Sequence, residues 1–275
     1  MAQKKNKAQQ QSARERVRQQ QQHAAARDQR MKVVFRSLIG VAVLVVVAVV
    51  AAIALNQGGT SSATPTTVTD DGGIVLDPGG EVAGGDAASA TADDAGTTAG
   101  DVPQVSTYID FQCPHCLTFE QANLPFLTDG LESGTISLAV HPVALMDNAS
   151  QGTNFSSRAA NAAVCVAEHQ PEALLDVTQG LFDLQQTAAQ GGVNDEVLTG
   201  AVADAGADSS AVRGCILEEE FAGWVRESTD RALSDPALAG PSGRFGTPTV
   251  LVDGQVYNGS IENPDELGTF IEQHR

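Results

Sequence analysis

Residues 104–117 read QVSTYIDFQCPHCL, and this stretch decides the fold. Val105, Thr107 and Ile109 alternate with the residues between them, which predicts a strand. Pro114 suits the first position of a helix, where its missing N–H leaves no hydrogen bond unmade. The stretch therefore predicts a strand that leads directly into a helix, with Cys113 at the junction.

Cys113 and Cys116 have the spacing that can close a small disulfide ring. In the reduced form the first sulfur lies at a helix N-terminus, where free N–H groups and the helix dipole favour a thiolate. His115 can carry positive charge near neutral pH and would favour the thiolate further. A stabilised thiolate stabilises the reduced pair, so the disulfide becomes a stronger oxidant of other thiols.

Two other interpretations of the pair are a zinc half-site and a structural disulfide. Structural zinc takes four ligands, usually as two close pairs, whereas the other cysteines, Cys165 and Cys215, are fifty residues apart. We therefore expect no metal and no cofactor. A structural bridge stays open, because C-x-x-C alone is only moderately specific. Four cysteines allow three pairings, and the residues alone do not choose among them.

The chain that follows continues with helices and strands. The helix after Cys116 should run from Leu117 to about Leu131, with a kink near Pro125. Residues 156–234 are rich in Ala and show helical spacing, which predicts four or five helices. The remaining predicted elements are strands at 136–140 and 248–252, a hairpin turn at Asp253-Gly254, a returning strand at 255–257 and a helix from Asn263 to about Gln273.

Charge is distributed unevenly along the 275 residues, whose net charge is −18. Residues 1–36 hold ten of the sixteen bases and two acids, a net of +8, so the other 239 residues net −18 − 8 = −26. Those 239 residues contain no Lys. Residues 37–275, with this excess of negative charge, repel nucleic acid, because phosphate binding needs clustered Lys and Arg.

Residues 38–55 are uncharged and apolar, and as a helix they would rise roughly 27 Å, close to the thickness of the bilayer core. Bases flank only the N-terminal side, which predicts a cytoplasmic head, residues 1–36, and an extracytoplasmic body. A cleaved signal peptide is the alternative. Its apolar region is usually shorter and its basic region brief, so we favour an uncleaved anchor over residues 37–55 of a single-pass cell-membrane protein.

Residues 56–101 are rich in Gly, Ala, Thr, Ser and Asp. This composition predicts a flexible linker, because it offers little apolar surface to bury. The apolar run Ile74-Val75-Leu76 is a possible exception and could add an edge strand to the domain. The folded domain is expected over residues 102–275.

The stretch from Asp110 to Cys116, followed by Gly246-Thr247-Pro248-Thr249 after a helical block, resembles the DsbA-like thiol–disulfide oxidoreductases of the membrane-anchored actinobacterial type. The resemblance covers about residues 102–275. It implies an α/β thioredoxin-like fold with an inserted helical block, here preceded by one transmembrane helix and a flexible linker. The implied activity is a thiol oxidase that introduces disulfides into exported proteins.

The resemblance also assigns roles to residues of the site. It implies that Cys113 is the exposed nucleophile and Cys116 the buried resolving cysteine, with Pro114 and His115 tuning the pair. Pro248 is similar to the family's cis-proline, beside which the Thr247 backbone would pair with a substrate strand. The family often carries a buried acid six residues before the nucleophile, and that position is Thr107 here.

The resemblance further implies a structural disulfide between Cys165 and Cys215, and partners that complete the redox cycle. These partners are exported proteins with free thiols, the lipid bilayer, and a quinone-linked membrane reoxidase of the DsbB or vitamin-K-epoxide-reductase type. A reductase or isomerase that uses the same residues is one alternative. A redox-silent interaction module on a tether is another.

Overall fold

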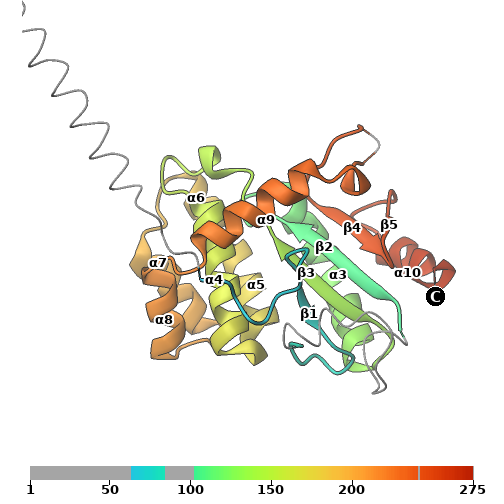
Figure 1. The fold of residues 1–275 in the computed structure, drawn as a ribbon, viewed down its shortest axis with the longest axis horizontal. Helices are drawn as coiled ribbons and strands as arrows, with labels where there is room; N and C mark the ends of the chain where they lie inside the picture. Colours follow the sequence, from blue (N-terminus) through green and yellow to red (C-terminus); the bar gives the residue numbers. More distant parts are fainter. Residues whose placement is uncertain (1–62, 84–101, 241, 275) are drawn as a thin grey trace, which may run out of the picture. The chain divides into compact units, whose positions relative to one another are not determined.

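The computed structural model describes residues 63–83, 102–240 and 242–274 (Figure 1). The chain divides into two units, Met1–Gly59 and Thr60–Arg275, and every described residue belongs to the second. The predicted head, 1–36, and the predicted anchor, 37–55, therefore lie outside the described residues. Within the described ranges, no helix is both long and apolar enough to cross a bilayer.

A five-stranded mixed sheet carries the domain, in the order β1-β3-β2-β4-β5. The central strand, β2, runs parallel to β3 and antiparallel to β4. The two edge strands, β1 and β5, are each antiparallel to their neighbour. The strands are β1 (Ile74–Leu76), β2 (Gln104–Ile109), β3 (Ser137–Pro142), β4 (Thr249–Val252) and β5 (Gln255–Val256).

The register of β2 gives it buried neighbours on both sides. Val105 lies opposite Leu138 of β3 and Val252 of β4, and all three side chains are buried. Ile109 at the end of β2 is fully buried and lies opposite Pro142. The turn that carries the cysteines therefore starts from a fixed point inside the core.

Helices pack beside the sheet, and Figure 1 shows α4–α8 gathered on one side of it, with α10 toward the other end. Helix α4 contacts β3, α5, α8 and α9, so it joins the helical block to the sheet. Helix α3 continues through Pro125 and contacts α10. The helices are α3 (Pro114–Glu132), α4 (Phe155–His169), α5 (Leu174–Asp183), α6 (Gln185–Ala189), α7 (Asp195–Asp204), α8 (Ser210–Leu217), α9 (Ala222–Ser234) and α10 (Pro264–Gln273).

The helical block contains six α-helices, α4 to α9, where the sequence predicted four or five. The extra break lies at Leu184, which separates α5 from α6 while keeping helical dihedral angles, φ −75° and ψ −10°. Because Leu184 is a good helix former, neither composition nor periodicity marks this break.

Residues 63–83 correct the prediction of a flexible linker over 56–101. Ile74 and Leu76 are buried in the core, and β1 pairs with β3 as the anticipated edge strand. The Glu168 carboxylate of α4 accepts hydrogen bonds from Thr66 N (2.8 Å), Thr66 Oγ1 (2.7 Å) and Thr67 Oγ1 (3.1 Å). A few apolar side chains at a sheet edge and one carboxylate thus hold a segment whose composition is typical of a linker.

The C-terminal elements follow local signals in the sequence, and these predictions are confirmed. Asp253 and Gly254 both have positive φ, 46° and 76°, as the tight turn between β4 and β5 requires. The Asn263 side chain accepts a hydrogen bond from Glu266 N, and Pro264 occupies the first turn of α10.

Candidate active site

Cys113 lies where β2 meets α3, at the helix N-cap, with extended dihedral angles (φ −79°, ψ 119°). Its N–H donates to Asp110 O (2.9 Å), which closes the turn after β2. Its own carbonyl accepts from Cys116 N (3.1 Å) and Leu117 N (3.2 Å). Pro114 takes the first position of α3, as predicted. The N–H that proline lacks would have no acceptor within the helix at this position, so no hydrogen bond is lost.

Both cysteines of the pair are free thiols in the structure, so it describes the reduced form. Cys116 is completely buried, as the resemblance implied. Cys113 is not the exposed residue that was expected, since only 5% of its surface is accessible. The Thr247–Pro248 peptide bond is cis, and the Cys113 thiol donates to Thr247 O at 3.3 Å. The loop with Pro248 thus covers the sulfur from 134 residues away in sequence.

The electrostatics of the two sulfurs differ strongly. A hydrogen bond from the Cys116 thiol lowers the pKa of Cys113 from 9.0 to about 5, helped by the Thr247 side chain and by the backbone N–H groups of Cys116 and His115, against the effect of burial. Burial raises the pKa of Cys116 well above its usual value. Near pH 7 the reduced site therefore holds a thiolate at Cys113 and a thiol at Cys116.

His115 contributes to the site through its backbone in this structure. Its N–H is among the groups that lower the pKa of Cys113, while its side chain is exposed. From the sequence, a charged imidazole was expected to stabilise the thiolate. That contribution stays a prediction, and a substitution of His115 that keeps the backbone N–H can isolate it.

Asp110 organises the active-site turn, a role that the sequence analysis did not assign to it. Its buried carboxylate accepts hydrogen bonds from Gln112 N (2.8 Å), Leu145 N (2.6 Å), Met146 N (2.9 Å) and Ser156 Oγ (2.7 Å). Burial nevertheless raises the pKa of Asp110. Its backbone N–H donates to Cys116 Sγ at 3.5 Å. An acid between the apolar residues Ile109 and Phe111 was the available sequence signal.

Thr107, at the position where the family often carries a buried acid, is buried in the middle of β2, opposite Val140 and Val250. Glu120 is the other buried acid of this region, one turn beyond Cys116 on α3. Burial raises the pKa of Glu120 to about 7. No local pattern in the sequence marks Glu120 as buried, because its burial depends on the packing of α3 beside α5.

Cys165 and Cys215 form a disulfide that joins α4 to α8, with an S–S distance of 2.01 Å and Cα atoms 5.8 Å apart. This is the pairing that the resemblance implied. His169 and Glu220 bring ligand atoms within 4.8 Å of the Cys215 sulfur and of each other, the one such group within the described residues. Because that sulfur is bound in the disulfide, an ion there would have too few ligands for a structural zinc site.

Comparison with known proteins identifies this arrangement. Residues 96–273 match the thioredoxin family. DsbA from Mycobacterium tuberculosis in its oxidised form is 31% identical, with a TM-score of 0.51, and the match covers 62% of this chain and 82% of that one. The chain is a DsbA-like thiol–disulfide oxidoreductase.

Other solved structures agree with this assignment of the DsbA-like protein. The reduced form of the same mycobacterial DsbA is 25% identical, with a TM-score of 0.55, over 74% of this chain and 92% of that one. MdbA, a thiol-disulfide oxidoreductase from Corynebacterium diphtheriae, shares the fold at 23% identity and a TM-score of 0.56, over 78% and 96%. None of the curated proteins compared with the chain matches it. The predicted α/β thioredoxin-like fold with an inserted helical block is confirmed.

Proposed function

We propose that this DsbA-like protein is a membrane-anchored, extracytoplasmic thiol oxidase that introduces disulfide bonds into exported proteins. The observation that carries the proposal is the low pKa of Cys113, about 5 in place of 9.0. At pH 7 such a difference stabilises the reduced form by about 2.7 kcal/mol, which corresponds to roughly 60 mV in a two-electron couple. A pair that is more stable when reduced draws electrons from other thiols.

The first step is attack by a client thiolate on the Cys113 sulfur of the oxidised pair. The Cys113–Cys116 bond breaks, and Cys116 leaves with the electron pair and takes up a proton from water. Cys116 is completely buried, which directs the attack to Cys113. The Asp110 N–H, 3.5 Å from Cys116 Sγ, stabilises the departing sulfur.

The second step releases the product. A second client thiolate attacks the client sulfur of the mixed disulfide, and Cys113 leaves as a thiolate. The client gains one disulfide and gives up two electrons, which now reside on the reduced cysteine pair. The Thr247 backbone, beside the cis bond to Pro248, is the edge on which an extended client strand would pair.

The membrane attachment belongs to the same proposal. An anchor at residues 37–55, with the basic head on the cytoplasmic side, would make the described domain extracytoplasmic. A quinone-linked membrane partner of the DsbB or vitamin-K-epoxide-reductase type would then reoxidise the cysteine pair.

A reductase or isomerase is the second candidate. Thiol–disulfide exchange is reversible, so the same cysteine pair could also carry electrons to a client disulfide. The two candidates differ in the reduction potential of the Cys113–Cys116 pair.

The deciding experiment equilibrates the full-length protein in detergent with glutathione buffers and follows the redox state of the pair. An oxidase requires a potential well above that of thioredoxin, about −270 mV. A value near that figure would select the reductase. Cys113→Ser should abolish disulfide transfer to a reduced client. Unchanged transfer would instead support the redox-silent module.

A further inference from the structure

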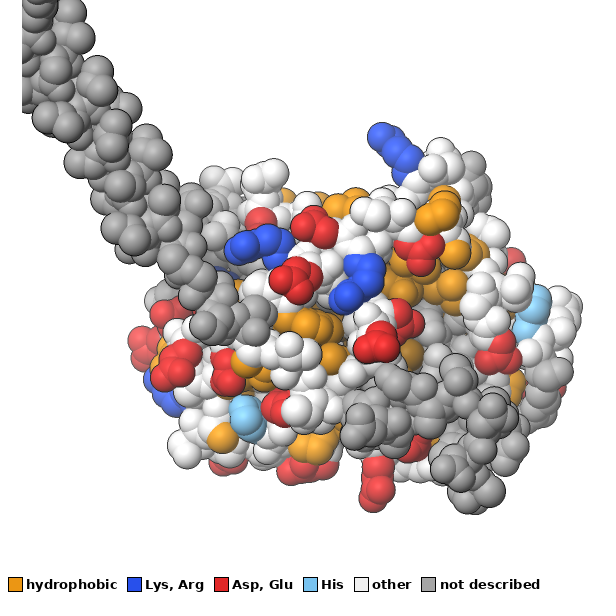
Figure 2. All heavy atoms as spheres, in the orientation of Figure 1, with side chains coloured by type: hydrophobic (Ala, Val, Ile, Leu, Met, Phe, Trp, Pro, Cys, Tyr) orange, Lys and Arg blue, Asp and Glu red, His pale blue; other side chains and the backbone are white. Residues whose placement is uncertain are grey.

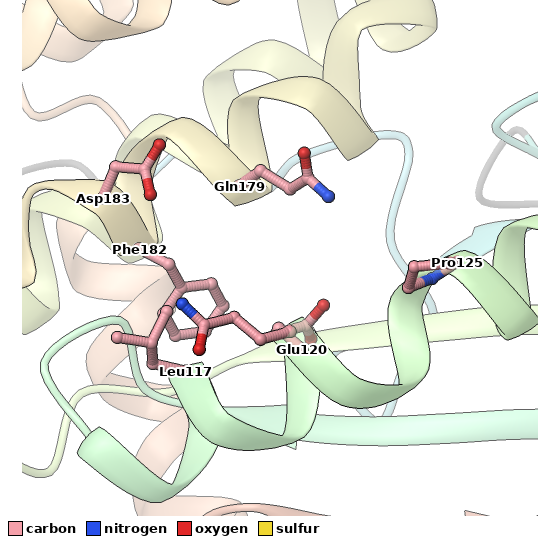
Figure 3. Close-up of a pocket in the computed structure, with 7 residues that line it drawn as sticks. Leu117, Glu120, Pro125, Gln179, Phe182 and Asp183 are labelled. Atoms are coloured by element: carbon pink, nitrogen blue, oxygen red, sulfur yellow. The ribbon is translucent and has the colours of Figure 1, made fainter. Parts of the chain in front are cut away.

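A groove runs along the active-site helix α3, on the side that faces α5. It consists of two adjoining cavities of about 300 Å³ and about 440 Å³, both lined by Pro125 and Gln179. The smaller cavity begins at Leu117, the residue after Cys116. Figure 3 shows its walls, with Leu117, Glu120 and Pro125 on α3 facing Gln179, Phe182 and Asp183 on α5.

Carboxylates dominate the charge of the groove. The smaller cavity is lined by Glu120 and Asp183, and the larger one by Asp129, Glu132, Glu172 and Asp176. No Lys, Arg or His is among the residues that line either cavity. Figure 2 shows that acidic side chains also spread over the face of the domain in view. The groove therefore attracts cations and repels anions.

Glu120 is the residue that points to a ligand. Only 8% of its surface is exposed, and Figure 3 shows its carboxylate directed into the space between the two helices. Among the described residues, no hydrogen bond or ion pair reaches this carboxylate, and burial alone raises its pKa to about 7. An unpartnered buried carboxylate is unfavourable, and a cation placed in the cavity would relieve it.

The position of Glu120 relates this cavity to the redox pair. Glu120 lies seven positions after Cys113, which is about 10 Å along the helix axis. An extended polypeptide covers about 3.3 Å per residue. A polypeptide bound through its cysteine at Cys113 could therefore place a side chain that lies within about three residues of that cysteine in the cavity.

We infer that the groove between α3 and α5 binds a segment of the client polypeptide that carries Lys or Arg, with one cationic side chain inserted beside Glu120. This inference rests on the proposed function, because it makes the groove a second binding region for the same client. The chain's own segment 84–101 is not a suitable occupant, since its charged residues are all acidic. An anionic membrane surface is repelled for the same reason.

Binding can be tested without any redox step. Two fluorescent peptides contain Ser in place of the client cysteine and differ only in Arg or its neutral analogue citrulline at the second following position. At pH 8, where Glu120 is ionised, full-length protein in detergent should bind the Arg peptide more tightly, by about five-fold to ten-fold. Glu120→Gln/Asp183→Asn should remove the difference. The control Glu227→Gln/Asp230→Asn removes the same charge from exposed positions of α9 and should retain it.

If both double variants weaken binding of the Arg peptide equally, the preference comes from the negative charge of the whole domain. The inference that the groove binds the cationic side chain would then be wrong. Equal binding of both peptides by the unsubstituted protein would overturn it as well. Emission from the single tryptophan, Trp224, checks that each variant is folded. If Glu120→Gln/Asp183→Asn does not fold, the single variant Asp183→Asn decides the matter through a smaller loss of the same preference.

Oxidation kinetics separate this inference from the proposed function. With dithiol versions of the two peptides, Arg should lower KM relative to citrulline in the unsubstituted protein and in the α9 control. If both peptides are oxidised with the same KM, the groove does not bind the cationic side chain, but the proposed oxidase activity still holds. If the protein binds the Arg peptide selectively but oxidises neither dithiol, the proposed oxidase activity is wrong, but binding in the groove still holds.

Discussion

Replacing Glu120 with Gln should change how the stability of the domain depends on pH. Burial raises the pKa of Glu120 from 4.5 to about 7. The folded protein therefore keeps this proton up to about pH 7, whereas the unfolded chain releases it near pH 4.5. The contribution of Glu120 to stability is fully present below pH 4.5 and is lost as the pH rises through 7. Gln cannot ionise, so Glu120→Gln lacks this loss.

The expected size follows from the two pKa values. Between pH 5 and pH 8 the original protein should lose about 2.5 kcal/mol of unfolding free energy relative to Glu120→Gln. The lower limit of pH 5 avoids the isoelectric point, about 4.4. Urea unfolding of the full-length protein in detergent, with the Cys165–Cys215 disulfide intact and the Cys113–Cys116 pair kept reduced, measures the difference.

The matched control is Glu227→Gln, which removes a carboxylate from an exposed position of α9. Its unfolding free energy should follow that of the original protein across the same pH range, because water surrounds this side chain in both the folded and the unfolded state. Parallel curves for Glu120→Gln and the original protein would mean that the Glu120 carboxyl is solvated. Its pKa would then not be raised, and the groove would lack the buried carboxylate that is proposed to bind a cation.

Four other expectations concern the site and its attachment. The reduction potential of the Cys113–Cys116 pair should fall by about 30 mV per pH unit above pH 5 and by about 59 mV per unit below it. The slope changes because Cys113 takes up a proton on reduction only below its pKa. A constant slope of about 59 mV per unit through pH 7 would show that Cys113 is not a thiolate at neutral pH. His115→Ser should raise the pKa of Cys113, followed by thiolate absorbance, by less than about one unit, because Ser retains the backbone N–H; a larger rise would assign the effect to the imidazole. Asp110→Asn should destabilise the domain in urea by about 2–3 kcal/mol, because the amide cannot accept all four hydrogen bonds of the carboxylate; an unchanged midpoint would contradict that role. In cells, the protein should fractionate with membranes, and protease added after removal of the wall should digest the domain; a soluble mature form that begins near Leu55 would contradict the anchor.

Elements with strong local signals were predictable from the sequence. Pro114 at a helix start, Asp253-Gly254 in a tight turn and the Asn263 cap each satisfy a requirement of the backbone within a few residues, and the structure has all three. The alternating strand that leads to Cys113 was equally clear. In each case neighbouring residues fix the conformation, so no knowledge of the rest of the fold is needed.

Features that depend on distant parts of the chain were not predictable in the same way. Cys113 is covered because Thr247 lies against it, and no local pattern indicates that contact. Residues 63–83 have the composition of a linker, yet Ile74 and Leu76 find a sheet edge to bury against. The burial of Glu120 likewise requires α5 to pack opposite α3. Tertiary contacts set all three outcomes, and they override local composition.

The difference between the two sulfurs bears on the direction of catalysis more directly than either pKa alone. A mixed disulfide at Cys113 has two fates, and the internal one, attack by Cys116 that expels the client, needs a Cys116 thiolate. Burial raises the pKa of Cys116 well above its usual value, so this thiolate is scarce at neutral pH. The productive fate expels Cys113, whose pKa of about 5 makes it a good leaving group. The same asymmetry therefore slows the return to client thiol and speeds release of the client disulfide, which is the behaviour expected of an oxidase.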